Sequence, residues 1–273
     1  MRVPLFESGR RLCLLLEAGG TRFSVEATSV TEVASPGPDE TSLRGVLEIQ
    51  DLSELLGGEP EPTPGMVVVF DVSPTLAVRV RSIVEVADVA RAVHFVLPSG
   101  LGATLASLSH SAVLYKERLY LELNADALPQ APGAAKPPAP LPVHLALSPP
   151  ERSLVFESQG RLFGLPLSYV SQVAMRTPSF CELPGRSGAV AGLLPHGQVL
   201  WPLYSAPALL LGGSVVAEDF LVLADVEGRR LGMCASRVLG VFPHFTSTLN
   251  PGEFTAPGLP MPVLFADPRR MFS

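Results

Sequence analysis

Residues 14–33 read LLLEAGGTRFSVEATSVTEV, and residues 154–173 read LVFESQGRLFGLPLSYVSQV. At a constant offset of 140 the two stretches share six of twenty residues without a gap, where roughly one identity is expected by chance. The identical positions are the pairs Leu14/Leu154, Glu17/Glu157, Gly20/Gly160, Phe23/Phe163, Val30/Val170 and Val33/Val173. The chain therefore contains one kind of structural unit twice.

Each copy has the pattern of a β-hairpin. Apolar residues alternate on both sides of Gly19-Gly20 in the first copy and of Gln159-Gly160 in the second. Alternation with a period of two, around a two-residue turn that contains glycine, is typical of paired antiparallel strands. After the hairpin, Val30 and Val33 change to an i, i+3 spacing, which predicts a single helical turn at this point.

The duplication continues beyond the hairpins. The sequence LLGG occurs at residues 55–58 and 210–213, and MVVVFD at 66–71 corresponds to LVLADV at 221–226. The offset between these segments is 155, against 140 in the hairpins, so the second copy has gained about fifteen residues between its hairpin and its LLGG. Frequent turn residues and the lack of a long amphipathic helix predict an all-β protein of small barrels, with short helical turns at the LLGG segments.

Residues 129–150 separate the two copies. Eight of these 22 residues are proline, which fixes φ and removes a backbone donor, so the segment suits neither a helix nor a central strand. We expect domain one at 1–128, a semi-rigid linker at 129–150, and domain two at 151–273, diverged and with a shortened C-terminal hairpin. The alternative for the proline-rich segment is a docking peptide for a peptide-binding domain.

The composition excludes several classes of protein. A hydrophobic content of 47% with 17% charged residues suits a globular chain, and a net charge of -6 with only two lysines argues against nucleic acid as a partner. The charged N-terminus argues against a signal peptide, and the three widely spaced cysteines are expected to be buried free thiols of a cytoplasmic protein. Residues 187–217 carry no charge, but prolines interrupt them, so a buried hairpin and loop is favoured over a membrane helix.

We find no motif for catalysis or ligand binding in the sequence. The five histidines lack metal-site spacing, no C-x-x-C occurs, and GLGATL at 100–105 lacks the third glycine of a dinucleotide loop. Asp51 and Glu54 precede the first LLGG and are expected to cap a short helix and not to form a catalytic acid pair. We therefore expect no enzyme activity, no cofactor and no metal. The histidines are His94, His110, His144, His196 and His244.

The order of the pieces resembles the CheW family, the coupling proteins of bacterial chemosensory arrays. In the first copy the hairpin is followed by SLRGVLEIQDLSELLGG at 42–58 and AVLYKERLYLELNADAL at 112–128, and the second copy has LPGRSGAVAGLLPHGQVLWPLY at 183–204. The resemblance covers residues 11–128 and 152–272. It implies two tandem CheW-like domains, each a pair of small five-stranded SH3-like β-barrels.

The resemblance also implies a partner-binding surface. The family's receptor-facing residues correspond to Val30, Glu32 and Arg44 in the first copy. In the second copy Val170 is kept, Gln172 replaces the glutamate, and His196 with Gly197 stands for the Arg-Gly pair. The alternative reading of Glu32 and Arg44 is an ordinary exposed ion pair, worth roughly 0–1 kcal/mol.

Three functions follow from these patterns. The first is a non-catalytic coupling or scaffold protein that binds a CheA-type histidine kinase regulatory domain, a chemoreceptor cytoplasmic tip or another CheW-like protein, in the cytoplasm at membrane-associated receptor clusters. The second is a CheW-like adaptor recruited to a non-array role such as motility or polarity signalling. The third is a small-molecule-binding β-barrel protein. Neither nucleic-acid binding nor membrane insertion is expected.

Overall fold

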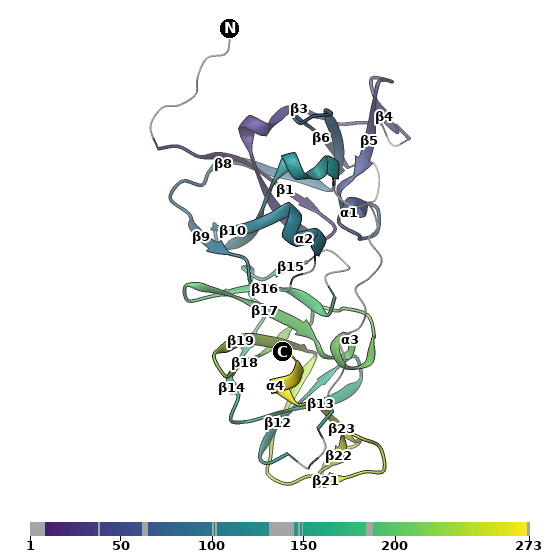
Figure 1. Ribbon diagram of the computed structural model, residues 1–273, viewed down its shortest axis with the longest axis vertical. Helices are drawn as coiled ribbons and strands as arrows, with labels where there is room; N and C mark the ends of the chain where they lie inside the picture. Colours follow the sequence, from purple (N-terminus) through teal and green to yellow (C-terminus); the bar gives the residue numbers. More distant parts are fainter. Residues whose placement is uncertain are drawn as a thin grey trace. The chain divides into compact units, whose positions relative to one another are not determined.

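Short β-strands are the main element of the fold (Figure 1). The computed structural model describes residues 9–271 except 38, 62–64, 100, 102, 131–144, 147, 149 and 184–187. The all-β prediction is confirmed, since every helix is a turn or two long. The elements of the first half are β1 (Leu12–Ala18), β2 (Thr21–Glu26), η1 (Ala27–Ser29), β3 (Val30–Ala34), β4 (Ser42–Leu43), β5 (Leu47–Asp51), α1 (Leu52–Leu55), β6 (Met66–Phe70), β7 (Leu76–Val80), β8 (Ser82–Asp88), β9 (Val93–Val96), α2 (Ala103–Leu108), β10 (Ser109–Tyr115), β11 (Arg118–Leu123) and η2 (Ala125–Gln130).

The second half repeats this order of strands with one additional early strand. Its elements are β12 (Ser153–Ser158), β13 (Arg161–Pro166), β14 (Val170–Met175), β15 (Cys181–Glu182), β16 (Val190–His196), β17 (Val199–Ser205), α3 (Ala206–Leu211), β18 (Phe220–Val226), β19 (Arg229–Ala235), β20 (Arg237–Phe242), β21 (Thr246–Ser247), β22 (Glu253–Thr255), β23 (Val263–Phe265) and α4 (Pro268–Met271). The uncharged stretch at 187–217 therefore forms strands and α3, as predicted. Among the described residues, no helix is long and apolar enough to cross a membrane.

Both halves build the same pair of sheets. The strand order β8-β1-β2-β11-β10-β9 of the first half reappears as β20-β12-β13-β23-β22-β21. The second sheet, β3-β6-β7-β5-β4, reappears as β14-β18-β19-β17-β16-β15. The internal repeat read from the sequence is thus a repeat of topology, and three of the four sheets have six strands where five were expected.

The two halves share their irregularities as well. The β1/β8 pairing shifts register between Leu15 and Leu16, and the β12/β20 pairing shifts between Val155 and Phe156, 140 residues later. The edge strands β3 and β14 shift in the same way after Val30 and Val170. A bulge adds one residue to a strand and turns its side chains to the other face. Shared bulges therefore preserve which side chains face each core.

Two details of the sequence-based prediction differ in the structure. The predicted helical turn after the first hairpin is present as η1, but Val30 and Val33 lie beyond it in β3. Their i, i+3 spacing arises within a strand, because a bulge lies between Val30 and Glu32. The match of MVVVFD to LVLADV is one residue out, since Val68 pairs with Val78 whereas Val222 pairs with Met233. The β18/β19 hairpin therefore has one more residue between equivalent paired positions than the β6/β7 hairpin.

The hairpin turns predicted at Gly19-Gly20 and Gln159-Gly160 are present, and both central residues of each have positive φ. The turns Glu227-Gly228 and Lys116-Glu117 have the same backbone. This backbone matches the twist of the flanking strands, and glycine adopts it without a Cβ clash. In Lys116-Glu117 neither residue is glycine, so that turn is held by its surroundings, which include two bonds of 2.8 and 2.9 Å from Lys116 Nζ to the carboxylate of Glu85.

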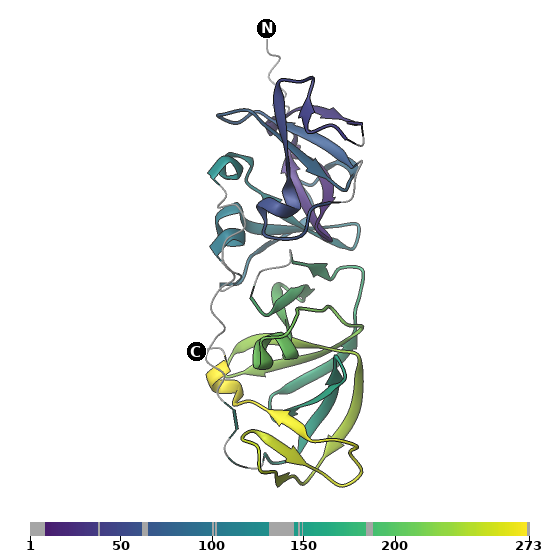
Figure 2. The ribbon, with the colours of Figure 1, turned by 90° about the vertical axis from the view of Figure 1, so that its right-hand side faces the viewer.

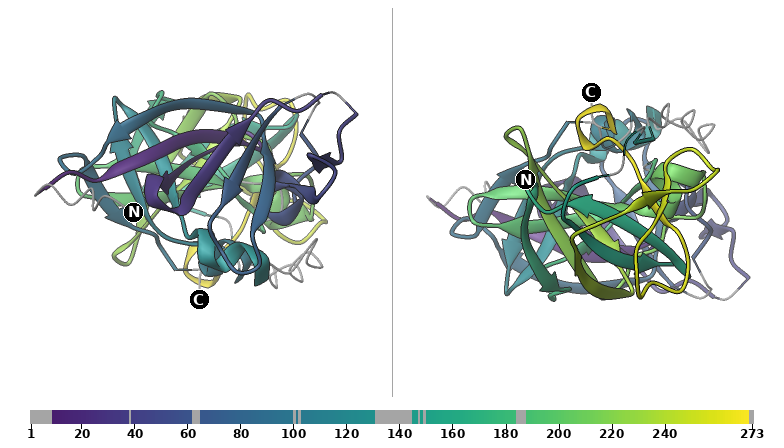
Figure 3. Two further views of the ribbon diagram at one scale, coloured as in Figure 1. Left: turned by 90° about the horizontal axis from the view of Figure 1, so that it is seen from above. Right: turned by 90° about the horizontal axis from the view of Figure 1, so that it is seen from below.

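Aromatic side chains fill the sheet of the second half that ends the chain. Phe265 on β23 is 1% exposed, and its ring lies edge-on to Phe245 and Phe254 at centroid distances of 5.0 and 5.7 Å. On β13, which pairs with β23, Gly164 leaves room for this ring. A Cβ there would lie 2.0 Å from Phe265 Cζ. The yellow C-terminal strands are seen from below in the right panel of Figure 3.

Two compact units make up the molecule, and they do not follow chain order. Unit 1 contains residues 1–137, 178–187 and 194–200, and unit 2 contains the remainder. Figure 2 shows the curled strands of the first half in purple to teal. Most of the proline-rich segment at 129–150 lies outside the described residues, so its role as a linker stays a prediction.

Candidate functional site

The side chains of Glu32 and Arg44 meet on the surface of unit 1. Arg44 Nη2 lies 2.5 Å from Glu32 Oε1. Glu32 is on β3 and Arg44 follows β4, and these strands are the two outer strands of the order β3-β6-β7-β5-β4. An ion pair between opposite edges is possible only where the sheet curls, so this pair bridges the seam of a small barrel.

A small apolar cluster lies beneath this seam. Val67, Val69 and Ala77 are buried, and Ala34 from β3 and Leu43 from β4 pack against them. The strands on either side of the seam therefore share one core. The ion pair above this core is solvent-accessible, since the side chains of Arg44 and Glu32 are 74% and 34% exposed.

A tight turn presents Arg44 to solvent. Arg44 and Gly45 both have positive φ, 55° and 70°, and the amide of Val46 donates to the carbonyl of Leu43 at 3.2 Å. Positive φ is costly for arginine, so the turn is held by its hydrogen bond and by the ion pair. Val46 is 90% exposed beside Arg44. The turn thus places a cation and an apolar side chain together at its tip.

The second half does not reproduce the ion pair. Val170 and Gln172 flank the bulge of β14, and Gln172 is exposed but uncharged. His196 ends β16 and is exposed, next to the turn that corresponds to the one holding Arg44. What the two halves share at this edge is an exposed valine, Val33 at 43% and Val173 at 40%. The assignment of these residues to a partner surface stays a prediction.

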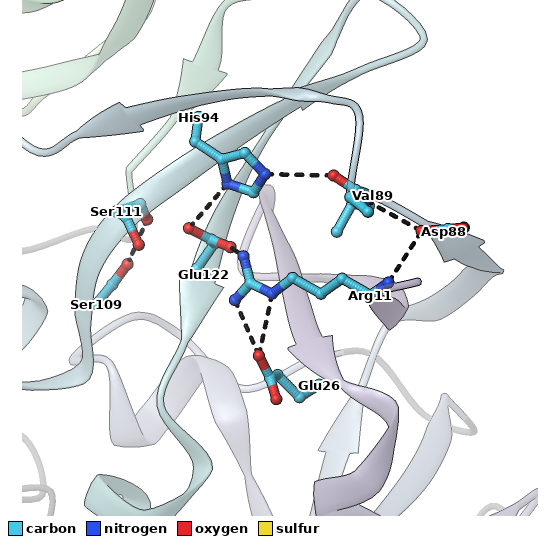
Figure 4. Close-up of polar contacts among 9 residues, drawn as sticks. Arg11, Glu26, Asp88, Val89, His94, Ser109, Ser111 and Glu122 are labelled. Atoms are coloured by element: carbon cyan, nitrogen blue, oxygen red, sulfur yellow. Dashed lines mark hydrogen bonds and ion pairs between the residues drawn. The ribbon is translucent and has the colours of Figure 1, made fainter. Parts of the chain in front are cut away.

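A second polar cluster ties together the strand ends of the first sheet (Figure 4). Arg11 Nη1 lies 2.5 Å from Glu122 Oε1, and its Nε donates to Glu26 Oε1 at 3.0 Å. His94 places Nδ1 3.6 Å from Glu122 Oε2 and Nε2 3.2 Å from the carbonyl of Val89. These residues come from β2, β9, β11 and the segments beside β1 and β8. The polar groups of this cluster contact one another, so we assign it a structural role in holding these strand ends together.

A buried carboxylate, Glu61, connects the first hairpin to Arg81, which lies between β7 and β8. Its side chain is 2% exposed, it accepts the amide of Gly19, and its Oε2 lies 3.1 Å from Arg81 Nε. Asp51 caps α1 by accepting the amides of Ser53 and Glu54 at 2.9 and 3.3 Å, as predicted, and also accepts the amide of Glu61. The sequence does not predict the role of Glu61, because it lies in an irregular loop without periodicity.

The cysteines carry no sign of activation. All three are buried and none forms a disulfide. Burial raises the pKa of Cys13 to about 11 and also raises the pKa of Cys181, so both thiols stay protonated at neutral pH. Among the described residues no group of three or more His, Cys, Asp or Glu side chains is placed to hold a metal ion.

Comparison with known proteins identifies one domain. Residues 152–255 match the family model described as "CheW-like domain". A solved structure described as the scaffolding protein TtCheW from Thermoanaerobacter tengcongensis is similar at 15% identity and a TM-score of 0.36, over 45% of this chain and 88% of that one. No curated protein matches the sequence.

Proposed function

We propose that this chain is a non-catalytic coupling protein that uses two CheW-like modules to bring signalling proteins together. The proposed partners are a CheA-type histidine kinase regulatory domain, a chemoreceptor cytoplasmic tip or another CheW-like protein. The observation that carries the proposal is the shared topology. The half that matches the CheW-like family and the half before it have the same order in one sheet, and the other sheet differs only by the added edge strand β15. The boundaries we propose are 1–128 and 151–273, with 129–150 as linker.

Two modules in one chain have a physical advantage for this role. Once one module has bound, the second contact becomes intramolecular and benefits from an effective concentration set by the linker. The modules also differ in the groups at this surface, because the first carries the ionic pair Glu32–Arg44 where the second has the uncharged Gln172. This difference supports a bridging role in which each module takes a different partner.

The test is equilibrium binding of the full chain to a CheA-type regulatory domain, to a receptor-tip segment and to a CheW-like protein. Arg44→Ala should weaken binding of one of these by roughly tenfold, which corresponds to about 1.4 kcal/mol. Lys116→Ala is the matched control, since the Lys116–Glu85 pair has similar exposure, 63% and 34%. Absence of binding to all three at about 100 μM would contradict the proposal.

A second candidate is a CheW-like adaptor that serves motility or polarity signalling outside chemosensory arrays. The observation that favours it is the uncharged Gln172 in the half that matches the family, because a receptor surface that relies on an ion pair is missing there. Fluorescent tagging distinguishes the two. Localisation that persists after deletion of the receptors supports the second candidate, and loss of localisation supports the first.

A further inference from the structure

Residues 178–183 belong to unit 1, although they follow β14 of the second half in the chain. The segment contains the short strand β15, and three of its side chains are buried: Phe180 at 5%, Cys181 at 0% and Leu183 at 7% exposure. The segment is therefore a packed part of unit 1. Its attachment to that unit can be traced to two neighbouring residues of β2, Thr21 and Arg22.

These two side chains bind the backbone of the segment. Arg22 Nη1 donates to the carbonyl of Pro178 at 2.9 Å, and its Nη2 donates to the carbonyl of Phe180. Thr21 Oγ1 donates to the carbonyl of Glu182 at 2.9 Å. The acceptors alternate along the segment, as is expected when an extended chain turns every second residue to one side. Because all three hydrogen bonds go to main-chain carbonyls, the same contact suits any extended strand.

The first half is specialised for this contact. Arg22 lies over the ring of Tyr120 on β11, 5.9 Å from its centroid, and the tyrosine is 2% exposed. The residue equivalent to Arg22 in the second half is Leu162, which is 2% exposed and part of an apolar core cluster. The equivalent of Thr21 is the exposed Arg161. The first hairpin thus presents a guanidinium at the position where the second buries a leucine.

We propose that the Thr21–Arg22 end of unit 1 is a docking surface for an extended strand, and that residues 178–182 of the same chain occupy it as a latch. While the latch is closed, the surface is shut to strands of other proteins. When it opens, the same side chains donate to the backbone carbonyls of an extended strand from a partner. The partner step rests on the proposed coupling function, whereas the latch itself does not. Occupancy by the same chain is favoured because tethering supplies a high local concentration of the segment.

Thiol labelling tests the latch without any partner. Cys181 lies in the docked segment, while Cys13 and Cys234 are buried elsewhere and report global unfolding. With N-ethylmaleimide and mass spectrometry of each cysteine peptide in the full chain, Arg22→Ala should raise the labelling rate of Cys181 about tenfold or more and leave the other two unchanged. Burial is the main cause of the raised pKa of Cys181 and Arg22 lowers that pKa, so loss of the arginine charge alone would slow labelling.

Further variants sharpen the result. Thr21→Val, which keeps the side-chain shape, should raise Cys181 labelling by a smaller factor, and Arg161→Ala in the second hairpin should have no effect. Unchanged Cys181 labelling in the Thr21→Val/Arg22→Ala double variant would overturn the latch, as would an equal rise at all three thiols. Protection of Cys181 that increases with protein concentration would overturn occupancy by the same chain. A failure of the coupling function leaves each of these readouts unaffected, so the two failures are distinguishable.

Discussion

Glu61 Oε2 lies 3.1 Å from Arg81 Nε, whereas the equivalent carboxylate of the second half, Glu218, lacks this partner because Ser236 occupies the place of Arg81. The equivalence is set by the backbone. The amides of Arg81 and Ser236 both donate 2.8 Å bonds to the glutamate carbonyl of the preceding hairpin. Glu218 Oε1 accepts the amide of Gln159 at 3.1 Å, and its Oε2 is buried without a hydrogen-bond partner among the described residues.

This asymmetry predicts opposite responses to one substitution. Glu61→Gln should destabilise unit 1 by about 1–3 kcal/mol, because the new amide donor faces the donors of Arg81. Glu218→Gln should change the stability of unit 2 by less than about 0.5 kcal/mol, or increase it, because it removes a buried unpaired charge. Hydrogen exchange of the Gly19 and Gln159 turns measures each unit separately. Equal losses in both variants would contradict the explanation.

Supplying the missing partner should stabilise the second half. Ser236→Arg places a guanidinium where Arg81 stands, within reach of the unpaired Glu218 oxygen. We expect a gain of about 0.5–1.5 kcal/mol in the free energy of unfolding of unit 2. Unfolding in urea followed by fluorescence reports on this unit, since Trp201 is the chain's one tryptophan and lies in unit 2. The gain should vanish when Glu218→Ala is added.

The Glu32–Arg44 pair should matter for binding more than for stability. Both side chains are exposed enough for water and salt to screen them, so a double-mutant cycle of Glu32→Gln and Arg44→Gln should give a coupling in stability below about 1 kcal/mol. Thermal unfolding without chemical denaturant, at two salt concentrations, measures this coupling free energy. A coupling above about 2 kcal/mol would show that the pair chiefly closes the barrel seam.

Asp88 should contribute to stability at neutral pH but not in acid. Its Oδ1 accepts the amides of Ala90 and Arg11 at 3.1 and 3.0 Å, which lowers the pKa of the carboxyl. A lowered folded-state pKa means that the contribution is present above the unfolded value of about 3.9 and is lost as the pH falls through the folded value. Asp88→Asn should therefore be less stable than the wild type at pH 7. The difference in unfolding midpoint should shrink steadily below about pH 4, and a constant difference would contradict this assignment.

Gly164→Ala should destabilise unit 2 strongly. The added methyl group would clash with the Phe265 ring, which Phe245 and Phe254 hold in place. We therefore expect a loss of about 3 kcal/mol in the free energy of unfolding, the upper end of the usual range for overpacking. Trp201 fluorescence during urea unfolding measures it. Adding Phe265→Leu should recover part of the loss, so the double variant should lose less than the sum of the singles. Simple additivity would show that the ring is not the cause.

The sequence by itself determined the repeat, the hairpins, the helical turns at both LLGG segments and the all-β class. These features depend on alternation and turn chemistry within about ten residues, which act locally. Only the tertiary structure decided which distant side chains meet: Glu32 with Arg44, Glu61 with Arg81, and Arg22 with the carbonyls of Pro178 and Phe180. Those meetings depend on sheet curvature and on the packing of segments remote in the chain, and no periodicity encodes them. The bulge at Val30 illustrates the limit of the sequence. The sequence showed a change of spacing there, but only the pairing of β3 with β6 distinguished a bulge from a helical turn.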